Sequence, residues 1–339
     1  MMNVLCRTLA LALLLLPVRV QGQTTPRAKA ESLLQSMRQA VATRPDPWRV
    51  ETETHVDVDR GKDNRVTDTY VSVCLRAGNK IDVQSKAIAE TDPNAKGPNR
   101  FLGITYRGIL DGWFLSYPVP SAGRRAGFAL FYPDGTKVSV LDGMKGLGAF
   151  EGWFSDNINI ADILQACPDL HVRGVESIAT HVCSVVEGKS EYGSYAVWTD
   201  PGTRYYPRKI SVQKSPDDLF LGKKLKDWHF LPGHTLSTAQ VVSFQIEMDN
   251  AEFEKTEDVL LPKKCRVIAT MLFSEGSRFI RTYDTRRTKV DLHATLDRYA
   301  FVPLLEEGAT LPNQQDLQKP YRWHGGKPVP KSAMPATAE

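Results

Sequence analysis

A strict alternation of apolar and polar residues recurs along this chain, and it limits the chain to a fold built around β-strands. From Val50 to Asp59, every second residue is Val or Thr, and the residues between them are acidic or His. The same pattern returns from Val242 to Met248. Because the side chains of a strand point alternately to the two faces of a sheet, each segment has one apolar face and one polar face that can face solvent.

Turn-forming residues separate closely spaced strand segments, which favours antiparallel pairing of sequential neighbours. The strands that we expect span residues 50–59, 65–76, 80–85, 101–106, 112–118, 128–132, 136–141, 178–187, 193–199, 207–212, 235–248, 265–273 and 278–292. Two segments have apolar residues at helical spacing instead, 26–43 and 146–165. The second of these is expected to form one or two helices that end at Cys167-Pro168.

An antiparallel sheet with one apolar face must be covered by another layer. We therefore expect an α+β fold, in which the two helical segments cover a strongly curved antiparallel sheet that forms an incomplete barrel, or half-barrel. The cover can fill the space completely, which gives a packed core, or loosely, which leaves a cavity. The sequence leaves both outcomes open.

The N-terminus has the parts of a secretory signal peptide: a basic Arg7, an apolar run over residues 9–18, and Gly22 near the expected cleavage site. The run covers about ten residues, whereas a membrane-spanning helix needs about 20. We expect residues 1–22 to be removed and the protein to act in the periplasm or outside the cell, without being integral to a membrane. An uncleaved anchor is the alternative. Residues 23–326 would form a single domain, and the Pro- and Gly-rich residues 327–339 a disordered tail.

Four cysteines follow the signal segment: Cys74, Cys167, Cys183 and Cys265. In an exported protein an even number suggests disulfides, and the nearest pair, Cys167 with Cys183, is favoured. The alternative is four buried free thiols.

No arrangement of residues predicts catalysis. The glycines between Gly143 and Gly152 lack the spacing of a dinucleotide-binding turn, and no Gly-x-Ser-x-Gly motif occurs. The seven histidines are scattered, and basic residues are spread over a chain of net charge +4. We therefore expect no enzymatic activity, no cofactor, no metal site and no nucleic-acid partner.

Aromatic side chains are the most distinctive feature of the apolar segments, and they suit either a packed core or an apolar ligand cavity. The residues that we expect to line such a cavity are Trp113, Phe150, Trp153, Phe154, Trp198, Val242, Phe244 and Ile246.

Three short segments resemble those of a known family. They are Trp198-Thr199-Asp200-Pro201 with Pro207-Arg208-Lys209-Ile210, Leu261-Pro262-Lys263-Lys264, and the stretch from Tyr321 to Lys327. The chain resembles bacterial periplasmic lipoprotein-carrier-like proteins, of the outer-membrane lipoprotein carrier or sorting type, as a large diverged secreted relative. The resemblance implies an incomplete barrel with a helical lid, whose apolar interior holds acyl chains.

The expected function is therefore non-enzymatic binding or transport of a lipid-like or lipoprotein ligand, with a lipid or an acylated protein as partner. The alternative is a secreted protein-interaction or envelope-stress sensor module, which would use the same sheet to bind an envelope protein and carry no lipid.

Overall fold

The structure is a computed structural model. It describes residues 25–61, 65–91, 104–119, 129–133, 158–220, 223–227, 239–297, 300–313 and 316–333, together with residues 148, 150 and 152. The signal segment, the expected strand at 136–141, and Trp153 and Phe154 lie outside the described residues.

Helix α1 (Pro26–Ala42) forms where the apolar spacing predicted it. The Thr25 hydroxyl caps its first turn by accepting a hydrogen bond from the Ala28 amide at 3.2 Å. Its buried stripe consists of Ala30, Leu34, Met37 and Ala40. Helix α2 (Ile160–Ala166) is shorter than the segment predicted to be helical, and it ends before Cys167-Pro168 as expected.

Thirteen strands form one antiparallel sheet, in the order β6-β5-β4-β3-β2-β1-β15-β14-β13-β10-β9-β8-β7. Among the described strands the order is linear, so the edge strands β6 and β7 do not pair with each other and the sheet that these strands form is not closed. The strands are β1 (Trp48–Asp59), β2 (Arg65–Ala77), β3 (Lys80–Thr91), β4 (Ile104–Leu110), β5 (Trp113–Pro118), β6 (Leu130–Tyr132), β7 (His171–Ile178), β8 (His181–Ser190), β9 (Gly193–Thr199), β10 (Pro207–Lys214), β13 (Val241–Thr256), β14 (Val259–Phe273) and β15 (Arg278–Asp291).

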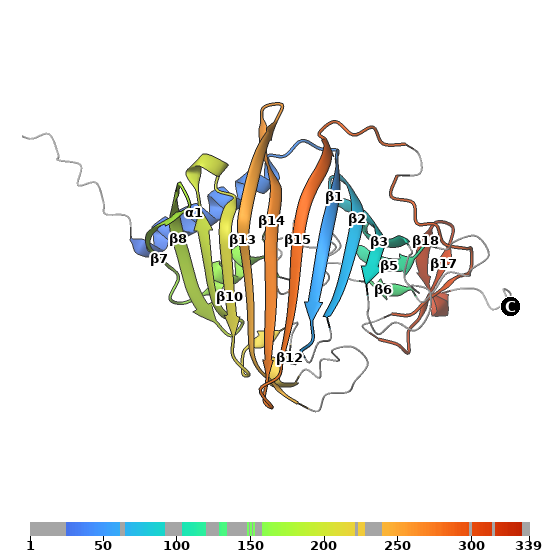
Figure 1. The fold of residues 1–339 in the computed structure, drawn as a ribbon. Helices are drawn as coiled ribbons and strands as arrows, with labels where there is room; N and C mark the ends of the chain where they lie inside the picture. The colour runs from blue at the N-terminus through green and yellow to red at the C-terminus, as the bar shows by residue number, and fades with distance from the viewer. Residues whose placement is uncertain are drawn as a thin grey trace, which may run out of the picture.

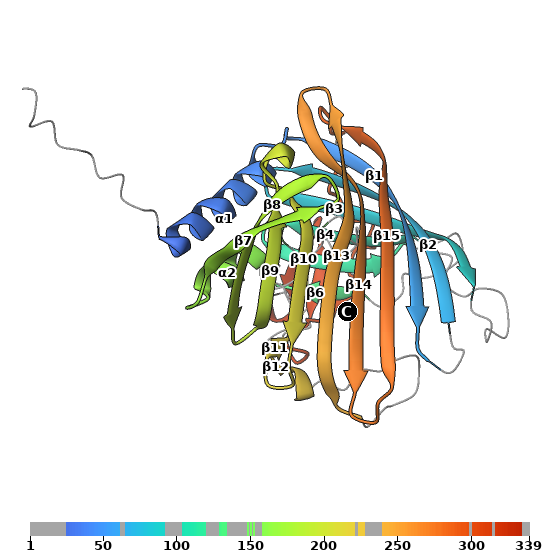
Figure 2. The ribbon, with the colours of Figure 1, turned by 60° about the vertical axis from the view of Figure 1, so that its left-hand side comes forward.

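The sheet has an inner side and an outer side (Figures 1 and 2). Turning the molecule brings β3 and β4 behind β10 and β13, because the sheet bends round on itself (Figure 2). Helix α1 lies beside β7, and α2 lies beside β8 and α1. The predicted antiparallel, unclosed sheet is confirmed, and among the described residues the main contacts of these two helices with the sheet are with β7 and β8.

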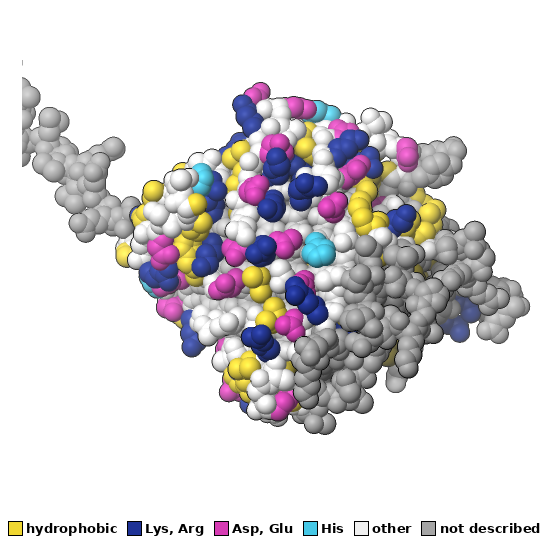
Figure 3. Space-filling view, in the orientation of Figure 1, with side chains coloured by type: hydrophobic (Ala, Val, Ile, Leu, Met, Phe, Trp, Pro, Cys, Tyr) yellow, Lys and Arg dark blue, Asp and Glu magenta, His cyan; other side chains and the backbone are white. Residues whose placement is uncertain are grey.

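The outer side of the sheet carries many charged side chains over its central strands. Figure 3 shows basic and acidic side chains interspersed on this face. Cross-strand ion pairs join neighbouring strands, such as Arg266 with Asp284 at 2.8 Å and Lys264 with Glu252 at 3.3 Å. The alternation along β13 and β14 thus separates a charged surface from an apolar inner face.

The end of the chain forms a further layer. Strands β16 (Thr310–Leu311), β17 (Tyr321–His324) and β18 (Lys327–Pro330) make a small sheet, and η6 (Lys331–Ala333) follows it. Residues 327–333, predicted to begin a disordered tail, are therefore structured. Gly325 and Gly326 have φ values of 58° and 76°, which glycine adopts without strain, and they turn β17 into β18. Residues 334–339 lie outside the described residues.

This small sheet packs against the outer side of β4–β6. Leu311 and Trp323 join Tyr106, Leu115 and Phe131 in a second apolar cluster. The remaining short elements are β11 (Leu219–Phe220), β12 (Lys223–Lys224), η4 (Pro201–Thr203) and η5 (Leu225–Asp227).

The predicted disulfide is absent, since all four cysteines are buried free thiols. Cys167 belongs to the main apolar cluster, whereas Cys183 lies on the opposite face of β8 with Val185 and Trp198. Cys74 on β2 and Cys265 on β14 are separated by β1 and β15. Three strand spacings amount to about 14 Å, twice the Cα separation that a disulfide allows.

Asp82 on β3 is a buried carboxyl next to the second cluster, with 7% of its surface exposed. Burial raises its pKa to about 6, and a hydrogen bond with Gln84 acts in the opposite direction. The charge of Asp82 in turn raises the pKa values of Tyr106 and Tyr117, for which burial is the larger cause. The Tyr117 hydroxyl accepts a hydrogen bond from the Leu304 amide at 2.6 Å, which ties the C-terminal segment to this region.

The raised pKa of Asp82 predicts a loss of stability with rising pH. The unfolded carboxyl ionises near pH 4 and the folded one near pH 6, so folding becomes less favourable across this window, by at most about 3 kcal/mol. In Asp82→Asn this contribution disappears, and the free energy of unfolding in urea should fall less between about pH 4 and pH 7. Asp111→Asn, at an exposed turn, is the control. Equal pH dependence of Asp82→Asn and the parent protein would contradict the assignment.

Candidate functional site

The inner face of the sheet carries one continuous apolar cluster. Alternate residues of successive strands build it, because in each strand every second side chain points inward. It extends from β8 and β9, through β10, β13 and β14, to β1, β2, β3 and β5. Its members on these strands include Val186, Tyr195, Ile210, Phe244, Met248, Val267, Met271, Val50, Cys74, Val83 and Phe114.

The structure brings together only part of the predicted cavity set. Phe150, Phe244 and Ile246 belong to the inner cluster, where the ring of Phe150 meets Phe253 edge-on at 5.5 Å. Trp113 packs instead against the second cluster, with its ring 5.9 Å from that of Trp323.

Two further predicted residues also differ from the expected placement. Trp198 lies on the outer face, in a third cluster with Cys183 and Val185. Val242 falls at a register shift between β13 and β14 and is half-buried, whereas its neighbour Val241 joins the inner cluster.

A buried polar row crosses the inner face between apolar residues. Arg287 on β15, Thr52 on β1, Ser72 on β2 and Ser85 on β3 stand directly opposite one another in the strand register. All four are at most 9% exposed. The hydroxyls of Ser72 and Ser85 are 2.8 Å apart, but the Thr52 hydroxyl has no hydrogen-bond partner within the described part of the chain.

Arg287 is the buried cation of this row. Its side chain is 3% exposed, and its guanidinium donates to Glu254 Oε2 at 3.2 Å. Burial lowers the pKa of Arg287, the hydrogen bond with Glu254 raises it, and the charge of Arg44 lowers it further. Glu254 is half-exposed and also pairs with Lys263 at 3.1 Å, which is the larger cause of its lowered pKa.

Aromatic rings hold Arg44 near the guanidinium of Arg287. Its guanidinium lies 5.7 Å from the centre of the Trp48 ring and 5.4 Å from that of Tyr206. Arg44 Nε donates to the Tyr206 hydroxyl at 2.9 Å, and this hydroxyl donates to the Ala40 carbonyl near the end of α1. The C-terminal end of α1 is thereby fixed next to the polar row.

A second buried cation, Lys214, lies elsewhere on the inner face and is 1% exposed. Its ammonium donates to the carbonyls of Tyr192 and Leu219 at 2.5 and 2.9 Å, and to the Tyr195 hydroxyl at 2.9 Å. Three acceptors match the three protons of an ammonium group, so these contacts account for its burial.

The segment from Trp198 to Pro201 ends β9 and begins η4. The Asp200 carboxylate accepts from the Gly202 amide and from Arg208 Nε, both at 2.7 Å. It thereby caps η4 and joins that turn to the start of β10. Arg208 in turn lies 5.2 Å from the centre of the Phe253 ring, at the edge of the inner cluster.

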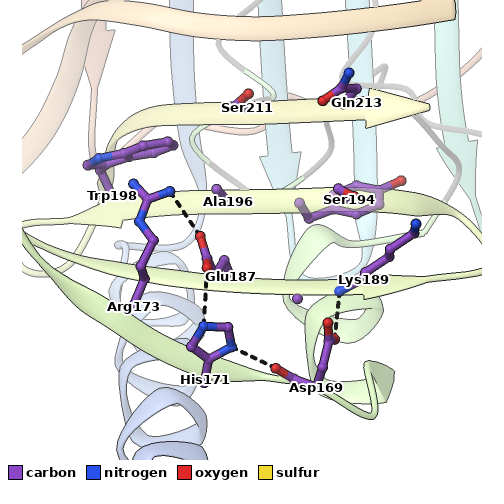
Figure 4. A pocket seen from close by; sticks show the side chains of 12 residues that line it. Asp169, His171, Arg173, Glu187, Lys189, Ser194, Ala196, Trp198, Ser211 and Gln213 are labelled. Carbon is purple, nitrogen blue, oxygen red and sulfur yellow. Dashed lines mark hydrogen bonds and ion pairs between the residues drawn. The ribbon is translucent and has the colours of Figure 1, made fainter. Parts of the chain in front are cut away.

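The outer face of β7–β10 holds a separate groove of about 400 Å³, which Trp198 lines (Figure 4). Its charged groups pair with one another: Glu187 bridges His171 and Arg173, at 3.1 and 3.0 Å. The Trp198 indole donates to Glu176 at 2.7 Å, and Lys209 lies over its ring. These contacts pair His171, Arg173 and the Trp198 indole with the carboxylates of Glu187 and Glu176.

Sequence reasoning missed both inner-face cations. Lys214 follows Ile210 and Val212 at spacing two, the parity of the inner face, and this signal could have identified it. Arg287 likewise follows the fully buried Thr285 at a spacing of two residues, but it lies among charged neighbours in Arg286-Arg287-Thr288-Lys289. Its burial emerges only when β15 pairs with β1.

In the described part of the chain, no three side chains of His, Cys, Asp or Glu lie close enough together to hold a metal ion. No described helix has both the length and the apolar character needed to cross a membrane.

Comparison with known proteins finds similarity in structure alone. No protein-family model and no curated protein sequence matches the chain. A DUF1329 family protein from Desulfovibrio piger is 12% identical, with a TM-score of 0.40, and covers 81% of this chain and 97% of its own. A LolA superfamily protein from Nitrosomonas europaea is 12% identical, with a TM-score of 0.38, and covers 80% and 96%. LprF from Mycobacterium bovis is 12% identical, with a TM-score of 0.23, and covers 80% and 98%.

These likenesses are distant. A LolA superfamily protein is among the solved structures to which this chain is similar.

The contacts of Asp200 predict graded losses of stability. Asp200→Ala leaves Arg208 buried without its carboxylate and uncaps η4, which should cost about 3 kcal/mol of unfolding free energy. Asp200→Asn keeps an oxygen for the Gly202 amide and should cost about half as much. Urea denaturation of the two variants checks the order, and equal losses would show that the hydrogen bond from the Gly202 amide contributes little.

Proposed function

We propose that this protein is exported and binds or carries a lipid-like ligand on the inner face of its sheet, without catalysing a reaction. The observation that carries this proposal is the extent of the inner apolar cluster, which follows the bend of the sheet from β8 to β5. An open, curved sheet of this kind forms a half-barrel whose apolar wall suits hydrocarbon chains.

The part of this wall away from the helices is the best place for a ligand. The described helices contact β7 and β8, whereas inward residues farther along the sheet are only partly buried. They are Ala251, Phe253, Ala269, Phe279 and Tyr283. Each CH₂ group that an acyl chain buries there contributes about 0.8 kcal/mol, so a chain of ordinary length can bind tightly.

The state of the cysteines is compatible with export. Burial raises the pKa values of Cys167, Cys183 and Cys265, and the residues are fully buried. Thiols in this condition do not readily form the thiolate that oxidation requires. Free cysteines therefore do not argue against the signal peptide expected at residues 1–22.

Blocking the wall should reduce ligand binding. Ala269 faces the inner cluster, opposite Ile246 on β13, so Ala269→Trp places a large ring where a chain would lie. Its matched control is Ile268→Trp on the neighbouring, outward position, opposite Glu247. We expect lipid to co-purify with the parent protein and with the control, and to be reduced several-fold in Ala269→Trp, as measured by mass spectrometry of extracted lipids.

Unfolding in urea checks that both variants fold. Folded protein that carries no lipid from its host, and binds no added acyl compound, would contradict the proposal. Co-purification of an envelope protein without lipid would favour an interaction or sensor module instead.

A further inference from the structure

We infer that the ligand of the inner face is an amphiphile with a negatively charged headgroup, a phosphate or a carboxylate, which binds where Arg287 and Thr52 meet. The inference rests on the proposed function and adds the chemistry of the ligand's polar end. Two independent observations lead to it, one about charge and one about hydrogen bonding.

The first observation is that the buried cation Arg287 has an incomplete counter-ion. A buried cation needs a close and well-desolvated counter-ion. Glu254 is an incomplete counter-ion for Arg287, because its side chain is 47% exposed and it also forms an ion pair with Lys263. The charge of Arg44 acts on Arg287 as well. The buried guanidinium is therefore paired with one half-solvated carboxylate that Lys263 shares, and a second anion close to Arg287 would complete its pairing.

The second observation is the hydroxyl of Thr52. It is buried, it has no hydrogen-bond partner among the described residues, and its residue is directly opposite Arg287 in the register of β1 and β15. A buried hydroxyl without a partner is costly. Phosphate and carboxylate oxygens accept hydrogen bonds from a guanidinium and a hydroxyl together, so one such group can satisfy both residues.

The position of this pair suits an amphiphile rather than a free anion. Val50, two residues before Thr52, belongs to the inner cluster, and Trp48 lies beside it. Beyond β15, the cluster continues on β14 with Cys265, Val267 and Met271. A headgroup at Arg287 therefore places its chains directly against the apolar wall. Lys214, by contrast, already has three acceptors within 2.9 Å.

The test compares two lipids that share one acyl chain and differ by a phosphate: oleoyl lysophosphatidic acid and monooleoylglycerol. Each is titrated against the full chain, after removal of lipid, with the uncharged fluorophore N-phenylnaphthylamine bound. We expect the phosphate-bearing lipid to displace the fluorophore at a concentration about tenfold lower. Glycerol phosphate, the headgroup without a chain, should displace nothing.

Two variants should move this preference in opposite directions. Arg287→Gln removes the buried cation and should abolish the tenfold preference, and Arg287→Lys should restore part of it. Glu254→Gln removes the competing carboxylate and should strengthen binding of the phosphate-bearing lipid several-fold. Titration with monooleoylglycerol, which carries no charge, reports whether each variant still binds an acyl chain. Should Arg287→Gln fail to fold, Glu254→Gln and Thr52→Val provide the comparison.

The outcomes separate this inference from the function on which it rests. Displacement by neither lipid contradicts both. Equal displacement by the two lipids, unaffected by changes at Arg287 and Glu254, overturns the charged headgroup and leaves lipid binding in place. A preference that is lost in Lys214→Met and kept in Arg287→Gln also overturns it. Displacement by glycerol phosphate at the same concentration as the lipid would show a site for soluble anions and overturn the amphiphile.

Discussion

The pairing of β1 with β15 is the interaction on which the rest of this structure depends. It joins the run β1–β6 to the run β7–β15, and its register extends from Arg49 opposite Asp291 to Asp59 opposite Ile280. The hydroxyls of Thr54 and Thr285 meet across it at 3.1 Å. Strands more than two hundred residues apart must find each other here, which costs loop-closure entropy that the local hairpins avoid. Without this seam there would be two smaller sheets and no continuous inner face.

The most distinctive polar group of the inner face forms at this seam. Arg287 comes from one side of it and Thr52 from the other. The alternation from Val50 to Asp59 already places Thr52 on the apolar face, whereas Arg287 lies among charged neighbours and becomes buried where β15 pairs with β1. A headgroup site at this position would be assembled only in the fully formed sheet, whereas the apolar wall on either side is built from hairpins of sequential strands.

Much of the fold follows from local pattern. The alternation from Val50 to Asp59 became β1, and α1 formed where the apolar stripe predicted it. The placement of the candidate site residues followed less closely from local pattern. Phe244 and Ile246 joined the inner cluster because their strand parity was read correctly, but Trp113 and Trp198 lie on the other face. A one-residue change of parity reverses the face of every side chain in a strand, and register shifts at positions such as Val242 make parity hard to assign.

The cysteines show the same limit in another form. Cys167 and Cys183 are near in sequence, and an even number of cysteines favoured a disulfide between them. They nevertheless belong to two different apolar clusters, which lie on opposite faces of β8. The sequence by itself determined the strands, the first helix and the apolar content of one face, because these depend on side chains at spacings of two to four residues. Only the tertiary structure decided which strands pair across the seam, which face each aromatic ring occupies, and where an arginine becomes buried. Those outcomes depend on contacts between residues far apart in the chain, and no local spacing encodes them.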